Sequence, residues 1–226
     1  MKLYKLTKQD GTTHDGYKYG IIGKIHKKEE KHNPRLCSSD VFHAYKNINL
    51  AFLLNSNHAN INNPVLWEIE GDICCEDFGK VGSFQQKVIG KINYPKWVNS
   101  DRDNKVRVLF AILCAESVYP LWEKYNGKDK RVLEAILAAR EYLKNPSSAA
   151  AAAAAAAYAA AAAAAYAYAA AAAYAAAYAA AAAYAYAAYA DAAAAAAAAD
   201  AAYAYAAYEI DFCELADRSV IENGFT

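Results

Sequence analysis

The stretch from Ala149 to Tyr208 contains no glycine, no proline, no β-branched residue and no basic residue. Its 60 residues comprise 47 Ala, 11 Tyr and 2 Asp, which are Asp191 and Asp200. Residues that interrupt helices are therefore missing, and alanine, the strongest helix former, dominates. We expect two or three stacked helices here. Their breaks are expected near residues 190 and 199, because the two aspartates are the local candidates for N-caps.

The tyrosines of this stretch recur at regular intervals. The hexads 184–189 and 203–208 share the pattern Tyr-Ala-Tyr-Ala-Ala-Tyr. On a helical wheel the tyrosines spread around much of the circle, which favours contacts on more than one side. They can be packing filler, a ligand pocket or an interface. An anionic ligand would need basic residues from earlier in the chain. The predicted ligand-binding residues are Tyr184, Tyr186, Tyr189, Tyr203, Tyr205, Tyr208, Arg107, Arg131 and Arg140.

The chain also lacks an excess of charge of either sign, since its formal net charge is zero. Residues 1–99 carry 14 basic and 10 acidic side chains, whereas residues 149–226 carry 1 and 7. This asymmetry favours attraction within or between subunits. Without a basic patch we predict no nucleic-acid partner. Alanine is only weakly apolar and the stretch lacks basic flanks, so we predict no membrane span.

Metal-type cysteine spacing and a secretory signal are missing as well. The number of cysteines is odd, and the adjacent pair Cys74-Cys75 cannot form the usual disulfide or a CxxC site. We therefore expect reduced thiols in the cytoplasm of a bacterial host cell. The five cysteines are Cys37, Cys74, Cys75, Cys114 and Cys213.

Catalytic motifs are absent from the sequence. It contains no phosphate-binding glycine loop, dinucleotide fingerprint, HExxH or GxSxG pattern. A histidine with Cys37 or a carboxylate could form a metal or nucleophilic site, and His43 is the strongest candidate because it falls on an apolar element near Cys37. Surface or structural histidines are the alternative. We predict no catalytic residue, no metal and no cofactor. The five histidines all lie in the first 58 residues, at His14, His26, His32, His43 and His58.

Short apolar runs in the first 98 residues predict a small α+β unit. Residues 2–6 alternate between polar and apolar side chains and precede an Asp10-Gly11 turn, as a half-buried strand does. The charged run 24–31 is expected to be a solvated loop or an edge. Asp40 and Asn47 are expected to cap short helices over 41–45 and 48–54. Further strands are expected over 17–22, 65–70 and 80–92.

From Asp101 the apolar period changes to about 3.6 residues, which predicts helices. The first is expected to end at Asn126, with Pro120 kinking or shortening its last turn. A second is expected after a cap at Asp129, and a last helix over 210–221. The predicted fold class is α+β, with a small N-terminal mixed α/β unit followed by an Ala/Tyr-rich all-helical bundle. The predicted domains are residues 1–99 and 100–226.

Two sets of motifs carry a resemblance to known families. The first comprises Leu3-Tyr4-Lys5, Asp10-Gly11, Phe42-His43-Ala44 after Cys37, Leu66–Gly71 and Lys80-Val81. It resembles a family of uncharacterised small domains of bacteria and their phages. The second comprises Leu109-Phe110-Ala111, Cys114-Ala115-Glu116, Lys130-Arg131, Glu134-Ala135 and Ala138-Ala139-Arg140. It resembles immunity-like proteins with an Ala-rich helical tail, in which Arg, Asp or Trp stand where this chain has Tyr. The resemblance implies a bacterial or phage setting and a role in conflict, and brings no catalytic residue.

These observations favour a non-enzymatic cytoplasmic binding protein encoded by a phage or prophage. We expect it to neutralise a protein toxin or to sequester a small signalling molecule, with a nucleotide-like compound as the alternative ligand. The expected oligomeric state is a homo-oligomer. A structural protein assembled through Ala/Tyr helices and an enzyme built on the N-terminal domain, which carries the histidines and Cys37, are the alternatives.

Overall fold

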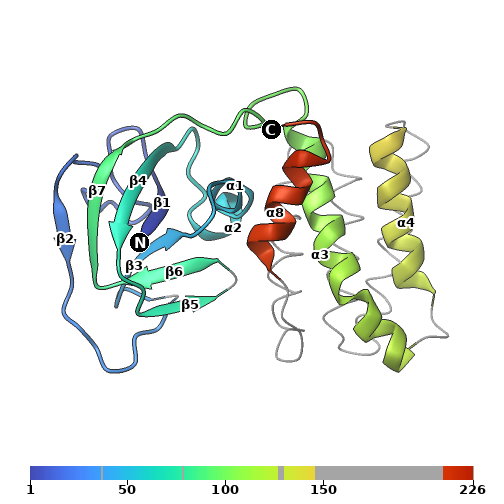
Figure 1. Cartoon of the computed structure of the whole chain (residues 1–226), viewed down its shortest axis with the longest axis horizontal. Helices are drawn as coiled ribbons and strands as arrows, with labels where there is room; N and C mark the ends of the chain where they lie inside the picture. The colour runs from blue at the N-terminus through green and yellow to red at the C-terminus, as the bar shows by residue number, and fades with distance from the viewer. Residues whose placement is uncertain (37, 78, 127–129, 146–210, 226) are drawn as a thin grey trace. The chain divides into compact units, whose positions relative to one another are not determined.

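The computed structural model describes residues 1–36, 38–77, 79–126, 130–145 and 211–225 (Figure 1). The chain divides into two compact units, one comprising residues 1–98 and 211–213, the other residues 99–210 and 214–226. The predicted division into two domains, residues 1–99 and 100–226, stays a prediction. The helices predicted for Ala149–Tyr208, and their breaks, lie outside the described residues.

A seven-stranded antiparallel sheet organises the first unit (Figure 1). The strand order is β2-β7-β4-β1-β3-β6-β5, so β1 lies in the middle and β2 and β5 form the two edges. Two short helices, α1 (Ile48–Leu53) and α2 (Asn55–His58), follow β3 in the chain. The strands are β1 (Lys2–Thr7), β2 (Ile25–Lys27), β3 (Phe42–Tyr45), β4 (Val65–Gly71), β5 (Cys75–Asp77), β6 (Lys80–Ser83) and β7 (Gln85–Lys91).

The predicted fold class, a small mixed α/β unit followed by an Ala/Tyr-rich all-helical bundle, is wrong. The N-terminal unit is built on an antiparallel sheet with more strands than the sequence indicates. Edge strands of three residues, such as β2 and β5, are too short to show an alternating pattern. After residue 98 the described part of the chain contains α3 (Asp103–Asn126), α4 (Arg131–Lys144) and α8 (Phe212–Ile221), and no all-helical bundle is evident in it.

Buried apolar side chains of β1 and β4 form part of the core of the sheet unit. The strand predicted over residues 2–6 is confirmed, because β1 places Leu3 among buried side chains that include Trp67 and Ile69 of β4. The predicted strand 65–70 is also confirmed, and β4 lies between β7 and β1. The indole N–H of Trp67 donates to the hydroxyl of Thr7 at 2.8 Å, so this buried donor has a partner.

The strand predicted over residues 17–22 is wrong. The main chain folds back onto the preceding loop there, since the N–H groups of Tyr19 and Gly20 both donate to the carbonyl of Gly11, at 2.9 and 2.8 Å. The Tyr19 side chain is fully buried, and its hydroxyl donates to Oε1 of Gln86 at 2.6 Å. A buried tyrosine with a hydrogen-bond partner therefore gives this loop the apolar appearance of a strand.

Two short strands lie where the sequence gives weak signals. β2 is an edge strand within the charged run 24–31, which fits the expected edge, since charged side chains protect edges from further pairing. The helix predicted over 41–45 is wrong, because β3 pairs with β6 and places Phe42 opposite Ser83. A run as short as this cannot distinguish a helical from an extended period. The strand region predicted over 80–92 is confirmed as β6 and β7.

Helices α3 and α4 pack against each other in the second unit (Figure 1). α3 continues through Pro120 and ends at the expected residue, Asn126, so the proline does not shorten it. Arg140 of α4 donates to Glu116 of α3 from two nitrogens, at 2.7 and 2.6 Å. Such a bidentate pair fixes the register between two helices. The expected cap of α4, Asp129, lies outside the described residues.

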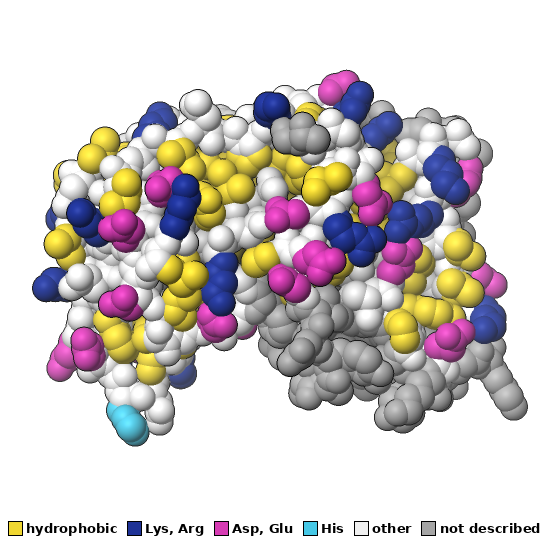
Figure 2. Space-filling view, viewed as in Figure 1, with side chains coloured by type: hydrophobic (Ala, Val, Ile, Leu, Met, Phe, Trp, Pro, Cys, Tyr) yellow, Lys and Arg dark blue, Asp and Glu magenta, His cyan; other side chains and the backbone are white. Residues whose placement is uncertain are grey.

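Charges of both signs are interspersed on the face of the molecule drawn in Figure 2. Lys and Arg side chains lie next to Asp and Glu side chains there, rather than gathering by sign. Among the described residues, no helix has the length and apolar character needed to cross a bilayer. The absence of nucleic-acid and membrane partners stays a prediction.

The N-cap predicted at Asn47 is confirmed, because its Oδ1 accepts the N–H of Leu50 at 2.9 Å at the start of α1. We expect Asn47→Ala to lower the free energy of unfolding by about 1 kcal/mol, since the first turn loses a side-chain acceptor. Urea unfolding followed by circular dichroism measures this change. Asn93→Ala, at an exposed position after β7, is the control, and an equal loss in both variants would contradict the assignment.

Candidate functional site

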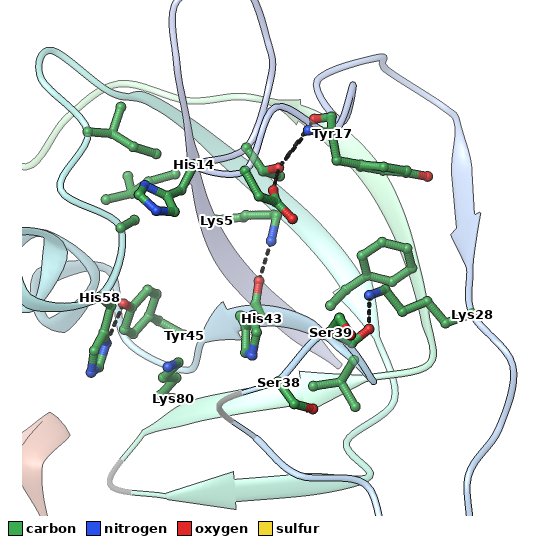
Figure 3. Close-up of a pocket in the computed structure, with 17 residues that line it drawn as sticks. Lys5, His14, Tyr17, Lys28, Ser38, Ser39, His43, Tyr45, His58 and Lys80 are labelled. Carbon is green, nitrogen blue, oxygen red and sulfur yellow. Dashed lines mark hydrogen bonds between the residues drawn. The ribbon is translucent and has the colours of Figure 1, made fainter.

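A cavity of about 500 Å³ opens in the sheet unit (Figure 3). Its walls come from β1, from the loops before and after β2, from β3, and from α2 and β6. This volume lies within the usual range of small-molecule sites. The lining residues are Lys5, Leu6, Thr13, His14, Asp15, Tyr17, Lys28, Ser38, Ser39, Val41, Phe42, His43, Tyr45, His58, Ala59, Ile61 and Lys80.

The cavity lies where β1 and β3 diverge. These neighbouring strands are paired at one position, Tyr4 opposite Tyr45. Beyond it β1 continues against β4, and β3 continues against β6. The ammonium group of Lys5 occupies the divergence and donates to the carbonyl of His43 at 2.5 Å (Figure 3). A side chain thus satisfies a main-chain acceptor of β3.

Lys5 is buried, with 7% of its surface exposed, and its Nζ lies 4.6 Å from the centre of the Tyr19 ring. Burial lowers the pKa of Lys5 from 10.5 to about 7. The nearby carboxylate of Asp15 acts in the opposite direction, whereas the positive charges of Lys28 and Lys80 lower this pKa further. The positive charges of Lys28 and Lys80 therefore repel that of Lys5.

Two of the three histidines that line the cavity, His43 and His58, are held in place by neighbouring polar groups. The Nε2 of His43 lies in hydrogen-bonding contact with the carbonyl of Leu36, and burial lowers the pKa of His43 to about 4. The Nδ1 of His58 lies 2.7 Å from the hydroxyl of Tyr45. Desolvation and the positive charge of Lys80 also lower the pKa of His58, although the residue keeps an exposed face. Both rings are therefore neutral at pH 7.

A catalytic or metal site formed by His43 with Cys37 stays an alternative that the described residues do not test. The ring of His43 is bound to a main-chain carbonyl, and Cys37 lies outside the described residues. In the described part of the chain, no three His, Cys, Asp or Glu side chains gather in a way that could hold a metal ion. The four described cysteines, Cys74, Cys75, Cys114 and Cys213, are free thiols.

The three arginines predicted to bind a ligand are not among the described residues that line this cavity. The six tyrosines (Tyr184, Tyr186, Tyr189, Tyr203, Tyr205 and Tyr208) lie outside the described residues. Arg107 is 8% exposed and its Nε donates to Asp103 at 2.5 Å within α3, while Arg140 binds Glu116. Arg131 begins α4 and is partly exposed. The nine assignments stay predictions.

The match to a family model decides the family of the chain. The model of immunity protein Imm5 matches residues 86–211, which is more than half of the chain. This chain belongs to the Imm5 immunity protein family. No curated protein and no solved structure matches it.

The Imm5 match and the cavity occupy different parts of the sequence. The match begins at Gln86 in β7 and includes α3 and α4. Every residue that lines the cavity precedes residue 86. Membership of the Imm5 family therefore confirms the resemblance to immunity proteins of the helical part and assigns no role to the cavity.

The sequence does not single out Lys5, Lys28 and Lys80 as site residues. One signal is present in β1, where Lys5 stands two residues from both Leu3 and Thr7 and so shares their buried face. A lysine at a core-facing position of a strand indicates either a buried ion pair or a cavity. The convergence with Lys28 and Lys80 follows from strand order, which the sequence does not encode locally.

The lowered pKa of Lys5 predicts how stability changes with pH. Between pH 7 and 10.5 the unfolded chain binds a proton on Lys5 that the folded chain has released, so the free energy of unfolding rises with pH. One proton corresponds to at most about 1.4 kcal/mol per pH unit. His43 contributes only below pH 6.5, since its pKa is lowered from that value to about 4.

Lys5→Met should therefore make the free energy of unfolding less dependent on pH between 7.5 and 9.5 than in the unmodified protein. Loss of the donor to His43 costs stability, but equally at each pH. Urea unfolding followed by tryptophan fluorescence across this range measures the slopes. Lys87→Met, at an exposed position of β7, should keep the original slope, and equal slopes for Lys5→Met and the unmodified protein would refute the prediction.

Proposed function

We propose that this Imm5-family chain neutralises a protein toxin by binding it, without catalysing a reaction, in the cytoplasm of a bacterial cell. The observation that carries this proposal is the match of the Imm5 family model over residues 86–211. A phage or prophage origin is part of the proposal and rests on the resemblance of the N-terminal motifs. Sequestration of a small signalling molecule, assembly through Ala/Tyr helices and homo-oligomer formation stay predictions.

The exposed face of α4 is the described surface that we propose for contact with the toxin. Lys130, Glu134, Leu137, Glu141 and Lys144 recur at helical spacing and are all exposed. Leu137 is 57% exposed in the middle of this charged stripe. Of the large hydrophobic side chains that are exposed among the described residues, it is the one within the Imm5 match. An apolar centre with a charged rim is the usual anatomy of a protein interface.

The predicted arginines fit this proposal to different degrees. Arg131 lies in the first turn of α4 and is partly exposed. Arg140 and Arg107 are engaged with carboxylates of their own unit, so we propose that they hold α3 and α4 in shape for binding. The six tyrosines, Tyr184, Tyr186, Tyr189, Tyr203, Tyr205 and Tyr208, are kept as proposed contact residues.

Co-expression in a bacterial host tests the function. The full chain is produced together with each candidate toxic domain found in its genomic neighbourhood, and surviving colonies are counted. We expect the chain to restore colony numbers by at least tenfold over the toxic domain alone. Survival that is unchanged despite soluble production of the full chain would refute toxin neutralisation by this pair.

A pair of matched variants tests the α4 surface. Leu137→Asp places a charge at the centre of the proposed interface and should abolish protection, because burying that charge against a partner is costly. Ile221→Asp, at a 60% exposed position outside the Imm5 match, should leave protection unchanged. Colony counts and circular dichroism of both purified variants are compared. Equal protection by both variants would exclude this face of α4.

A further inference from the structure

Three lysines and one carboxylate line the cavity of the sheet unit. Lys5 comes from β1, Lys28 directly follows β2, and Lys80 begins β6. Figure 3 shows them approaching the same space from separate elements. Asp15 is the single acidic residue among the lining side chains, so positive charge is in excess there.

Two of these lysines direct their ammonium groups to neutral acceptors. Lys5 donates to the carbonyl of His43, and Lys28 donates to the carbonyl of Ser39. Elsewhere in the same sheet unit, Lys2 binds the carboxylate of Glu68 at 2.7 Å, whereas Lys18 also donates to a main-chain carbonyl, that of Asp10. Main-chain carbonyls satisfy hydrogen bonds without cancelling charge. The hydrogen bonds of Lys5 and Lys28 therefore do not neutralise the charge of their ammonium groups.

Placing three lysines around one cavity costs free energy, and this cost appears as the lowered pKa of Lys5. Burial together with the charges of Lys28 and Lys80 disfavours its ammonium form. An anion in the cavity would face all three lysines and would reverse this effect. A phosphate group suits the position, because charge-assisted hydrogen bonds from ammonium groups to phosphate oxygens are short and strong.

The remaining walls suit an uncharged part of the same ligand. Tyr17, Phe42 and Tyr45 contribute aromatic rings, and Ser38 and Ser39 contribute hydroxyl groups. Tyr17 is 43% exposed, so one aromatic wall is open to solvent. A cavity of about 500 Å³ is larger than a single phosphate needs and is within the range for a nucleotide-sized compound.

We propose that the cavity between β1 and β3 binds a phosphate-bearing small molecule of nucleotide size, with its phosphates facing Lys5, Lys28 and Lys80 and its ring system near Tyr17 and Phe42. This site does not rest on the proposed toxin neutralisation, because its lining residues all precede the Imm5 match. Its described lining residues lie in the sheet unit and include none of the predicted arginines.

Calorimetric titration of the full chain with ADP, pyrophosphate and adenosine tests the site. ADP should bind, pyrophosphate should compete with it, and adenosine should bind at least tenfold more weakly because it lacks the phosphates. Lys80→Gln and Lys28→Gln should each weaken ADP binding by about tenfold or more, as expected for losing a charged hydrogen bond. Lys28 is only partly buried, so its variant remains informative if Lys80→Gln does not fold.

Lys87→Gln is the matched control, because Lys87 is an exposed lysine of β7 that does not line the cavity. Its affinity for ADP should equal that of the unmodified chain. The proposal is overturned if ADP and pyrophosphate give no heat of binding, or if adenosine binds as well as ADP. Unchanged ADP affinity in both cavity variants would also overturn it. Binding of hexaglutamate without binding of ADP would assign the cavity to an acidic protein segment instead.

Discussion

The hydrogen bond from the Lys5 ammonium group to the carbonyl of His43 joins two central strands of the sheet where they separate. β1 and β3 are neighbours in the sheet order but are paired at Tyr4 and Tyr45 alone. Where they separate, a carbonyl of β3 loses its strand partner and needs another donor. Lys5 supplies it from the core-facing side of β1. Lys5 thus lies both at the divergence of two central strands and on the wall of the cavity between them.

The charged side chains of the helices and those of the cavity have different hydrogen-bond partners. In the second unit, Arg107 pairs with Asp103, and Arg140 pairs with Glu116 through two hydrogen bonds. Those charges are cancelled by carboxylates and hold helices in place. In the cavity, Lys5 and Lys28 donate to main-chain carbonyls, which do not cancel the charge of an ammonium group. Burying like charges costs stability, and such a cost is common at functional sites.

Local signals predict some elements of this fold and fail for others. The alternation around Leu3 predicts β1, and Asn47 predicts the start of α1, because both signals act over a few neighbouring residues. The loop at Tyr19 resembles a strand because a buried ring needs apolar neighbours in either structure. The sequence around β3 wrongly predicts a helix, because a strand of four residues is too short to distinguish a helical from an extended period.

The cavity could not be predicted in the same way. Lys5 and Lys80 are far apart in the sequence and meet through a strand order that places β1 beside β3 and β3 beside β6, while Lys28 reaches the cavity from the loop after β2. The Imm5 match begins only in β7, so family membership accounts for the helical part and leaves the sheet unit to be explained by its own chemistry. Burial disfavours the charged form of Lys5, so a lysine at this position carries a cost that a neutral donor to the carbonyl of His43 would not carry. A buried lysine between diverging strands is better explained by a ligand whose negative charge it meets.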